Sequence, residues 1–327
     1  MKIAVKKMVC LVAASVGLLA VAAGTASAQT FPSKPIRIVV PFGAGGVADL
    51  TARTVAQKMT ESLGQAVVID NKPGAGGVVA GDAVAKAEPD GHTLLLMSNG
   101  TAVSAGLFKS LPFDAVRDFA PISTLGYFDI AVLTAADAPY KSMAELLAFA
   151  KAHPGKVNVG TINIGSTQNL AAELFKTRAG LDFLIVPFNG TPAVTTALRG
   201  HQVDVAVEIL GPMMGQVQSK VVRVLAVMGD TRASQLPDVP TLMQSGVADF
   251  DVSSWNALAA PVKTPKDVIA RLNREVQAAL NAPDVKKRLY ELNVEAKGST
   301  PEQLGKLLQS DIKRWSEVIT RAGVPKM

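Results

Sequence analysis

The stretch Pro41-Phe42-Gly43-Ala44-Gly45-Gly46 has the composition of an anion-binding loop. It stands where a predicted strand passes into a predicted helix. Unpaired backbone N–H groups and the positive end of the helix dipole meet at such a junction, so an anion can bind there without an arginine. Asp49, one turn into the helix, is expected either to orient a water molecule or to complement the dipole. The alternative interpretation is that the glycines only form a tight turn.

A second stretch of this kind, Gly160-Thr161-Ile162-Asn163-Ile164-Gly165-Ser166-Thr167, precedes another predicted helix. Its hydroxyls and backbone donors suit a carboxylate, and its simpler interpretation is a Ser/Thr helix cap. Two such loops in two halves of one chain favour the binding interpretation. A third set, Ser98-Asn99-Gly100-Thr101, follows a predicted strand and is expected to add side-chain donors or to form a polar turn.

A dinucleotide site is the main alternative for the first loop. Gly43, Gly45 and Ala48 match the spacing of the dinucleotide fingerprint, and Asp70 ends the next strand, where a ribose-binding acid is expected. Pro41 and Phe42, however, separate the strand from the first glycine. An exported protein also rarely uses a soluble nicotinamide cofactor, so this alternative is disfavoured.

Other signatures of catalysis are missing from the sequence. His92, His153 and His201 lie beside glycine or proline turns, lack the spacing of metal ligands and are expected at the surface. There is no Gly-x-Ser-x-Gly elbow, P-loop lysine motif or pair of carboxylates in an acid/base setting. We therefore predict no enzyme activity, catalytic residue, metal or cofactor.

The first 28 residues have the pattern of a cleavable secretory signal peptide. Lysines precede an apolar run that is too short to span a membrane, and Ala26-Ser27-Ala28 closes it, so cleavage is predicted after Ala28. The only cysteine, Cys10, falls inside this leader, which excludes disulfides and thiolate sites from the mature chain. Three lysines of the leader account for half of the formal net charge of +6, and the remaining basic residues are scattered. The sequence therefore does not indicate a nucleic-acid-binding surface.

From residue 36 onward, short β-rich runs alternate with segments of helical periodicity, which predicts βαβ units in an α/β fold. The length and the 48% hydrophobic content predict two domains. A long extended run over 122–134 is expected to leave the first domain, and one over 255–260 to return to it. Only helices are expected after that return, over 265–280, 283–292 and 301–322.

With both loops considered, nearly the whole mature sequence resembles the substrate-binding receptors of tripartite tricarboxylate transporters, also called the Bug family. Several segments carry the resemblance in the same order along the chain. They are Phe31-Pro-Ser-Lys-Pro-Ile36, the 41–46 loop with Asp49 and Arg53, Asn71-Lys-Pro-Gly-Ala-Gly-Gly77, Pro89-Asp-Gly-His-Thr93, His153-Pro-Gly155, Val186-Pro-Phe-Asn-Gly190, Gly200-His-Gln-Val-Asp204 and Leu236-Pro-Asp-Val-Pro-Thr241.

The resemblance implies a two-lobed periplasmic-binding-protein fold of type II, with a mixed, mostly parallel sheet in each lobe. Lobe 1 is expected over 29–131 and 252–327, and lobe 2 over 132–251. A small organic carboxylate is expected in the cleft between the lobes, which close around it by a hinge motion. The residues expected to bind it are Phe42, Gly43, Ala44, Gly45, Gly46, Asp49, Ser98, Asn99, Thr101, Thr161, Asn163, Gly165, Ser166, Thr167, Phe188, Asn189 and Glu208.

The sequence departs from the family pattern at three positions. Asn169 stands where many relatives have histidine, Phe188 replaces a common tyrosine, and Glu208-Ile209 replaces Asp-Asn. The cleft is therefore expected to be less polar than that of citrate receptors, which predicts an aromatic or otherwise apolar monocarboxylate. The predicted partners are the membrane subunits of a tripartite transporter. The alternatives are a membrane sensor kinase that receives the signal, or the nicotinamide-dependent oxidoreductase discussed above.

Overall fold

The computed structural model describes residues 31–164 and 166–327. The predicted leader, its cleavage after Ala28 and the predicted ligand contact Gly165 lie outside the described residues. The chain divides into two compact units, 1–33 and 34–327. The described part of the first unit, residues 31–33, contains no helix or strand. The second unit contains all the elements below.

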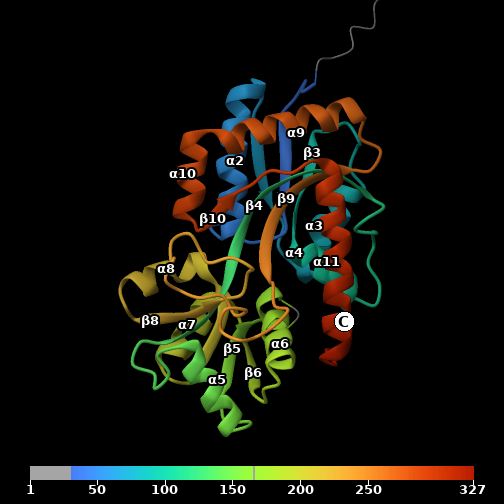
Figure 1. Cartoon of the computed structure of the whole chain (residues 1–327). Coiled ribbons are helices and arrows are strands. Elements are labelled where there is room, and N and C mark those ends of the chain that lie inside the picture. The colour runs from blue at the N-terminus through green and yellow to red at the C-terminus, as the bar shows by residue number, and fades with distance from the viewer. Residues whose placement is uncertain (1–30, 165) are drawn as a thin grey trace, which may run out of the picture. The chain divides into compact units, whose positions relative to one another are not determined.

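Helices and strands alternate along most of the second unit (Figure 1). The strands are β1 (Ile36–Val40), β2 (Val67–Asn71), β3 (Thr93–Ser98), β4 (Phe119–Ala135), β5 (Asn158–Ile162), β6 (Leu184–Phe188), β7 (Val205–Ile209), β8 (Val222–Val227), β9 (Ser253–Pro261) and β10 (Val294–Ala296). The helices are α2 (Val47–Leu63), η1 (Ala75–Gly77, a 3-10 turn), α3 (Val78–Ala85), α4 (Asn99–Leu107), α5 (Met143–Ala152), α6 (Thr167–Ala179), α7 (Thr191–Arg199), α8 (Leu210–Gln218), α9 (Lys266–Asn281), α10 (Pro283–Glu291) and α11 (Pro301–Arg321).

The long strand β4 belongs to both halves of the structure. Its residues 119–129 pair with β9, whereas residues 130–135 pair with β7 and β8. The strand order β2-β1-β3-β9-β4-β7-β5-β6 therefore runs from one half into the other, and β10 and β8 pair with β4 outside this path. Figure 1 shows β4 and β9 passing between the upper and lower groups of helices. This agrees with the predicted two-lobed α/β fold, and the exact lobe boundaries remain a prediction.

The sheet is mixed, as expected, but parallel pairing does not predominate. It is limited to β1 with β2 and β3, and to β5 with β6 and β7. Every pairing of β4 and β9 is antiparallel. The βαβ units account for the parallel pairs, because crossover helices join parallel neighbours. The two crossing strands run in opposite directions between the halves, so they add antiparallel pairs to each.

Helices cover both faces of each half. In the first half, α3, α4 and α11 pack on one face and α2, α9 and α10 on the other (Figure 1). In the second half, α5 and α6 share one hydrophobic core with α4 and α11, and α7 and α8 form the other. The core near α11 is fastened by a buried polar contact, since Trp255 Nε1 donates to Asp311 Oδ2 over 2.7 Å.

Local signals explain the ends of the longest helices. Gly64 ends α2 in the left-handed conformation at φ +66°, where glycine carries no steric penalty. Thr300 begins α11 through a capping box with Gln303, and Pro301 occupies the first turn, where its missing N–H is harmless. α11 buries one apolar face, which includes Leu304, Leu308, Trp315 and Ile319.

Three elements were absent from the sequence-based prediction. Helices α4 and α8 occupy segments with glycines, and α8 also contains Pro212. Strand β10 contradicts the expectation that only helices follow the return strand, because residues 294–296 pair with residues 126–128 of β4. A three-residue edge strand carries too little periodicity to be recognised in a sequence.

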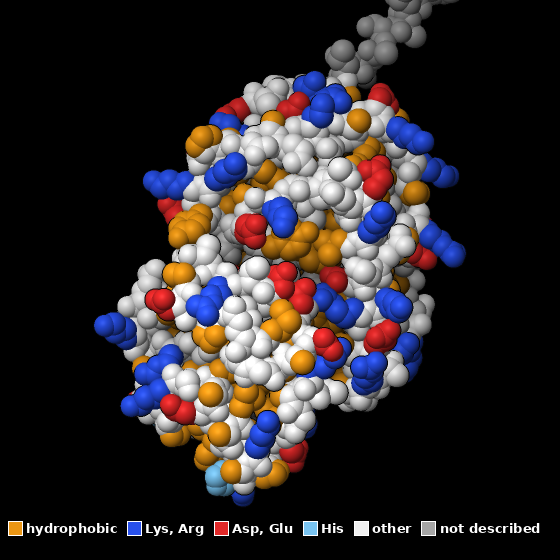
Figure 2. Space-filling model, in the orientation of Figure 1, with side chains coloured by type: hydrophobic (Ala, Val, Ile, Leu, Met, Phe, Trp, Pro, Cys, Tyr) orange, Lys and Arg blue, Asp and Glu red, His pale blue; other side chains and the backbone are white. Residues whose placement is uncertain are grey.

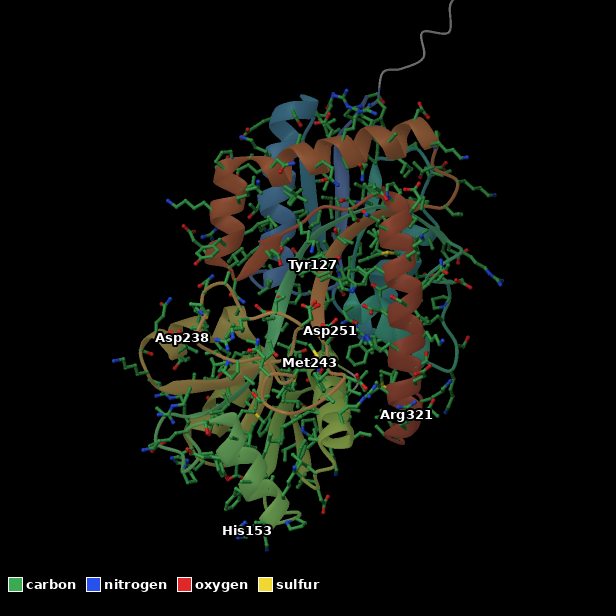
Figure 3. All side chains as sticks on the ribbon, in the orientation of Figure 1. Tyr127, His153, Asp238, Met243, Asp251 and Arg321 are labelled. Carbon is green, nitrogen blue, oxygen red and sulfur yellow. The ribbon has the colours of Figure 1, made fainter. Side chains whose placement is uncertain are left out.

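A broad groove lies over β4 and β9, bordered by β10, α10 and α11. It encloses about 810 Å³ and includes Tyr127 and Asp251, which Figure 3 shows near the middle of the molecule. On the face shown in Figure 2, basic and acidic side chains are intermixed and a hydrophobic hollow lies between them. This face has no continuous basic stripe.

Among the described helices, none combines the length and apolar character that crossing a membrane requires.

Candidate functional site

Asp49 holds the loop between β1 and α2 in one conformation. Its Oδ2 accepts from the backbone N–H of Gly45 over 2.8 Å and from Arg53 Nε over 2.9 Å, and its Oδ1 accepts from Asn71 Nδ2 over 2.9 Å. The side chain is only 1% exposed. Burial alone would raise the pKa of Asp49, but the hydrogen bonds from Arg53, Gly45 and Asn71 together lower it. Asp49 therefore serves as an internal anchor of the loop.

The loop that Asp49 anchors presents backbone donors to solvent. Residues 42–46 are all exposed. Among the described residues, no hydrogen bond uses the N–H of Gly43, Ala44 or Gly46. Gly45 has φ +85°, a conformation that glycine adopts without strain. Three N–H groups without a partner among the described residues thus lie at the start of a 17-residue helix, which suits an anion, and the anion site itself stays a prediction.

The 98–101 segment begins helix α4 and is not an open turn. Ser98 Oγ accepts from the N–H of Gly100 over 3.1 Å, and Thr101 Oγ1 accepts from the N–H of Ser98 over 3.2 Å. Both hydroxyls therefore cap the helix. Of the two roles predicted for this segment, this favours the structural one over that of a donor to the ligand. Ser98 and Thr101 also line one small cavity together with Phe42, which brings two of the predicted sets together.

Two buried asparagines beside this cap have unused polar atoms. Asn99 donates from Nδ2 to the Ser253 carbonyl over 3.3 Å, but its Oδ1 has no partner among the described residues. Asn256, opposite Ser98 in the β3–β9 register, is fully buried and has no partner at either side-chain atom. An unpaired buried amide is costly, which marks both asparagines as candidate ligand contacts. Asn256 was missed in the sequence; its only signal is an asparagine inside an apolar strand.

The start of α6 has the predicted helix cap and an exposed tip. Ser166 Oγ accepts from the N–H of Asn169 over 3.1 Å, and Asn169 Nδ2 donates to Thr161 Oγ1 over 3.2 Å. Thr161 and Thr167 are buried, whereas Asn163 is exposed. The Ser166 hydroxyl therefore caps α6, as the sequence predicts for a serine at this position. A role in ligand binding remains a prediction for all of these residues.

Glu208 is the centre of a polar cluster that joins three elements of the second half. Its Oε2 accepts from Gln168 Nε2 over 3.3 Å, from Thr191 Oγ1 over 3.2 Å and from the N–H of Ile209 over 3.1 Å. Gln168 and Thr191 lie in the first turns of α6 and α7, and Ile209 caps α8. Burial raises the pKa of the Glu208 carboxyl to about 7 against the lowering effect of these hydrogen bonds. Gln168 and Thr191 were not predicted from the sequence.

Phe188 and Asn189 follow strand β6 at the same end of the second half. The ring of Phe188 is half-buried and lies over Gly160, since a Cβ built there would be 3.4 Å from Phe188 Cε2. Asn189 is exposed. Phe188 therefore adds an apolar surface at the end of β6, packed on the core under α7 and α8, and the less polar site stays a prediction.

The two sets of loops approach each other through their helix starts. A Cβ built at Gly211 in α8 would lie 3.6 Å from Cγ2 of Val47, the first residue of α2. Gly211 follows Glu208 by three residues, and Val47 follows Gly46. The glycine loop and the Glu208 cluster therefore lie at neighbouring helix starts. No hydrogen bond among the described residues joins the glycine loop directly to the α6 loop.

Other predicted features occupy separate places. Asp70, the acid of the dinucleotide alternative, lies 3.4 Å from Arg37 and 3.5 Å from Lys72, so its charge is already paired. Two histidines are exposed as expected, but His92 is buried, with Nδ1 3.3 Å from Asp90 Oδ1. Asp90 Oδ1 also accepts from the backbone N–H of His92 over 2.9 Å, and the burial of this residue corrects its predicted surface position. No group of histidines, cysteines and acids suited to a metal occurs among the described residues.

Comparison with known proteins identifies a family along most of the chain. Residues 51–324 match the model of the tripartite tricarboxylate transporter family receptor. The chain is 37% identical to the UPF0065 protein in the tcbD-tcbE intergenic region of Pseudomonas sp. (strain P51), over 94% of this chain and 95% of that protein. It is 34% identical to Protein BugT of Bordetella pertussis, over 95% of this chain and 97% of that protein.

Solved structures agree in fold and sequence. The periplasmic binding protein BugD matches with a TM-score of 0.79 and 32% identity, over 91% of this chain and 100% of BugD. An R. palustris protein solved with adipate matches with a TM-score of 0.82 and 30% identity, over 91% of this chain and 100% of that protein. MatC from Rhodopseudomonas palustris, solved with malate, matches with a TM-score of 0.77 and 33% identity, over 88% of this chain and 100% of MatC. This chain belongs to the family of tripartite tricarboxylate transporter receptors, which are solute-binding proteins.

Proposed function

We propose that this receptor binds a small organic carboxylate in the periplasm and delivers it to the membrane subunits of a tripartite transporter. Its mechanism is binding and closure of the two lobes, and no bond is made or broken. The observation that carries the proposal is the free N–H groups of Gly43, Ala44 and Gly46 in a loop anchored by Asp49. Relatives solved with adipate and malate support a carboxylate as the ligand.

The α2 loop suits a carboxylate because its donors are held in place before the ligand arrives. Asp49 fixes the loop through Gly45, Arg53 and Asn71, so little conformational freedom remains to be lost on binding. Charge-assisted hydrogen bonds contribute on the order of 1.5–3 kcal/mol each, so two or three of them supply roughly 3–9 kcal/mol. Burial of the rest of the ligand must offset the cost of association. The second lobe is proposed to close over the rest of the ligand with the α6 loop.

A thermal-shift screen of the purified protein against a panel of carboxylates tests this proposal. NAD is included in the panel to test the oxidoreductase alternative. Binding of one acid should raise the melting temperature, and Gly45→Ala should abolish that rise because alanine is strained at φ +85°. Gly64→Ala is the matched control. It imposes the same kind of strain at φ +66°, at the far end of α2, and should lower stability without affecting binding. A shift with NAD and none with any acid would contradict the proposal.

A further inference from the structure

Asp129 lies at the point where strand β4 passes from the first half into the second. It is the last residue of β4 that pairs with β9, opposite Ser253, and from residue 130 onward β4 pairs with β7 and β8. Its half-buried side chain lines the groove over β4 and β9. A small bend between the two halves therefore changes the surroundings of this carboxylate directly.

Acidic side chains approach Asp129 from both halves. Glu295 of β10 lies opposite Tyr127 in the antiparallel register, which places it diagonally from Asp129 on the same face of the sheet. From the second half, a Cβ built at Gly229 would lie 3.6 Å from Asp129 Oδ1, and Asp230 is the next residue. Both acids line the groove together with Asp129. Asp129, Asp230 and Glu295 together are the hinge carboxylates.

The basic side chains of the groove are bound elsewhere or lie apart from the hinge carboxylates. Arg314 forms an ion pair of 2.8 Å with Asp311, and Lys297 Nζ lies 5.6 Å from the centre of the Tyr127 ring. Arg232 makes two hydrogen bonds of 2.8 Å within the second half. Among the described residues, no ion pair involves a hinge carboxylate. Their mutual repulsion is therefore not relieved by a bound cation of the protein.

The candidate ligand loops and the groove lie on opposite sides of β4 and β9. In the strand order β2-β1-β3-β9-β4, with β10 next to β4, the loops at 41–46 and 98–101 follow β1 and β3, which lie beyond β9. The hinge carboxylates lie over β4 and β10 on the other side. A rotation about β4 and β9 that brings the ligand loops of the two halves together therefore moves the sides of the groove apart.

We propose that repulsion among the hinge carboxylates keeps the groove wide and so favours closure of the ligand cleft, and that protonation of Asp129 lets the groove narrow and the cleft open. The inference goes beyond the proposed function, because it describes a pH-dependent control of the lobes. It rests on that function only for what the cleft holds.

The surroundings of Asp129 place its protonation in a mildly acidic range. Burial raises the pKa of the carboxyl from 3.8 to about 6, the charges of Glu295 and Asp230 also raise it, and a hydrogen bond with Asn293 lowers it. The conformer that holds like charges closer together has the higher pKa, so a fall in pH through about 6 favours the narrow groove.

Three further groups of the groove carry charge or titrate. Apart from the residues already named, they are Asp251 beside β9, and Lys286 and Tyr290 of α10. None of the three contributes to the pKa shift of Asp129. Figure 2 shows acidic side chains at the rim of the hydrophobic hollow between the two halves.

The distance between two spin labels across the groove tests the proposal without any ligand. The only cysteine of the chain is Cys10, so Lys287→Cys on α10 and Asp238→Cys in the second half add two labelling sites beyond the predicted leader. Both positions are exposed, and Asp238 is labelled in Figure 3. From pH 8 to pH 5 the distance should shorten by about 2 Å or more, the scale of hinge rearrangements, with its midpoint near pH 6.

Three variants of the labelled protein identify the group that responds. Asp129→Asn removes the charge at equal size and should give the short distance at every pH. Asp267→Asn, at an exposed position of α9, is the matched control and should leave the response to pH unchanged. Glu295→Gln leaves Asp129 in place and should move the midpoint to lower pH, because it removes one of the two like charges that raise the pKa of Asp129.

The inference is overturned by a distance that stays constant or lengthens from pH 8 to pH 5. A response that persists in Asp129→Asn also overturns it. If Asp129→Asn does not fold, Glu295→Gln decides in its place, and an unchanged midpoint rejects the role of the hinge carboxylates. No ligand is present in these measurements, so their outcome is separate from the thermal-shift screen that tests carboxylate binding.

Discussion

Replacing Glu208 by glutamine should change how the stability of the protein depends on pH. The carboxyl of Glu208 has its pKa raised from 4.5 to about 7, chiefly by burial. Between these values the folded protein retains a proton that the unfolded chain has released. The stabilising contribution is therefore complete below about pH 4.5 and is lost as the pH rises through about 7. Glutamine does not titrate, so the variant lacks this loss.

The expected size follows from the shift of the pKa. One pKa unit corresponds to 1.36 kcal/mol, so a shift from 4.5 to about 7 amounts to about 3 kcal/mol between pH 4 and pH 8. The free energy of unfolding of Glu208→Gln, minus that of the wild-type protein, should increase by this amount over that range. Any constant difference, such as an unpaired amide in the variant, shifts the whole curve and leaves its slope unchanged.

Urea unfolding at a series of pH values measures this difference. Trp255 and Trp315 are both buried, so their fluorescence reports unfolding of the first half, and circular dichroism reports the whole chain. Glu88→Gln, at an exposed glutamate, is the control for the substitution itself. Wild-type and Glu208→Gln curves that stay parallel within about 0.5 kcal/mol from pH 4 to pH 8 would refute the assignment of Glu208 as a buried carboxyl that protonates near neutrality.

Three further substitutions test the packing and the anchor of the site. Gly211→Ala should destabilise the protein by about 1–3 kcal/mol in urea unfolding, because its Cβ would lie 2.5 Å from the Leu292 carbonyl oxygen. Gly215→Ala in the same helix has open space and should be neutral or stabilising; equal effects of the two would contradict the close approach. Asp49→Asn should weaken carboxylate binding at least about tenfold in calorimetry, and unchanged affinity would show that the anchor is dispensable. Trp255→Phe should lower the free energy of unfolding by about 1–3 kcal/mol, because it leaves the Asp311 carboxylate without its indole donor. An unchanged unfolding midpoint would contradict a stabilising role for this hydrogen bond.

Much of the α/β pattern was predictable from local signals. The alternation of β-rich runs and helical segments predicted from residue 36 onward is confirmed, first by β1 and α2, and Gly64 ends α2. Here the apolar periodicity, the glycine at the helix end and the final packing all favour the same structure. The long crossing strand was also predicted, although β4 extends to residues 119–135 because both sheets pair with it.

The helices that were missed depend on tertiary contacts. α4 and α8 contain glycines, which disfavour a helix by local propensity. In the structure these glycines allow close approach. A Cβ at Gly106 would be 2.7 Å from Ser316 Oγ of α11, and one at Gly211 would be 2.5 Å from the Leu292 carbonyl oxygen. Packing against a distant segment overrides the local preference, and a single sequence does not show that segment.

The residues of the candidate site were likewise predictable where they are neighbours in the chain, and not where tertiary contacts bring them together. The glycine loop was predictable because strand, loop and helix start are consecutive in the chain. The partners of Asp49 were only partly predictable from the sequence. Arg53 follows Asp49 by one helical turn, whereas Asn71 reaches the loop only through the pairing of β1 with β2. Glu208 was predicted as a ligand contact by resemblance. Its partners Gln168 and Thr191 come from two other helices that only the folded sheet brings together.

The stability of the Glu208→Gln variant decides what the buried carboxylate contributes to the second half. A glutamine of the same size would avoid the cost of ionising a buried group, which is about 3 kcal/mol above pH 7. If Glu208→Gln is more stable than the wild-type protein at pH 8, the carboxylate is retained at the expense of stability, as expected for a residue that serves binding. If Glu208→Gln is less stable at pH 8, the three donors from Gln168, Thr191 and Ile209 need the charge of the carboxylate, and Glu208 serves to hold the starts of α6, α7 and α8 together.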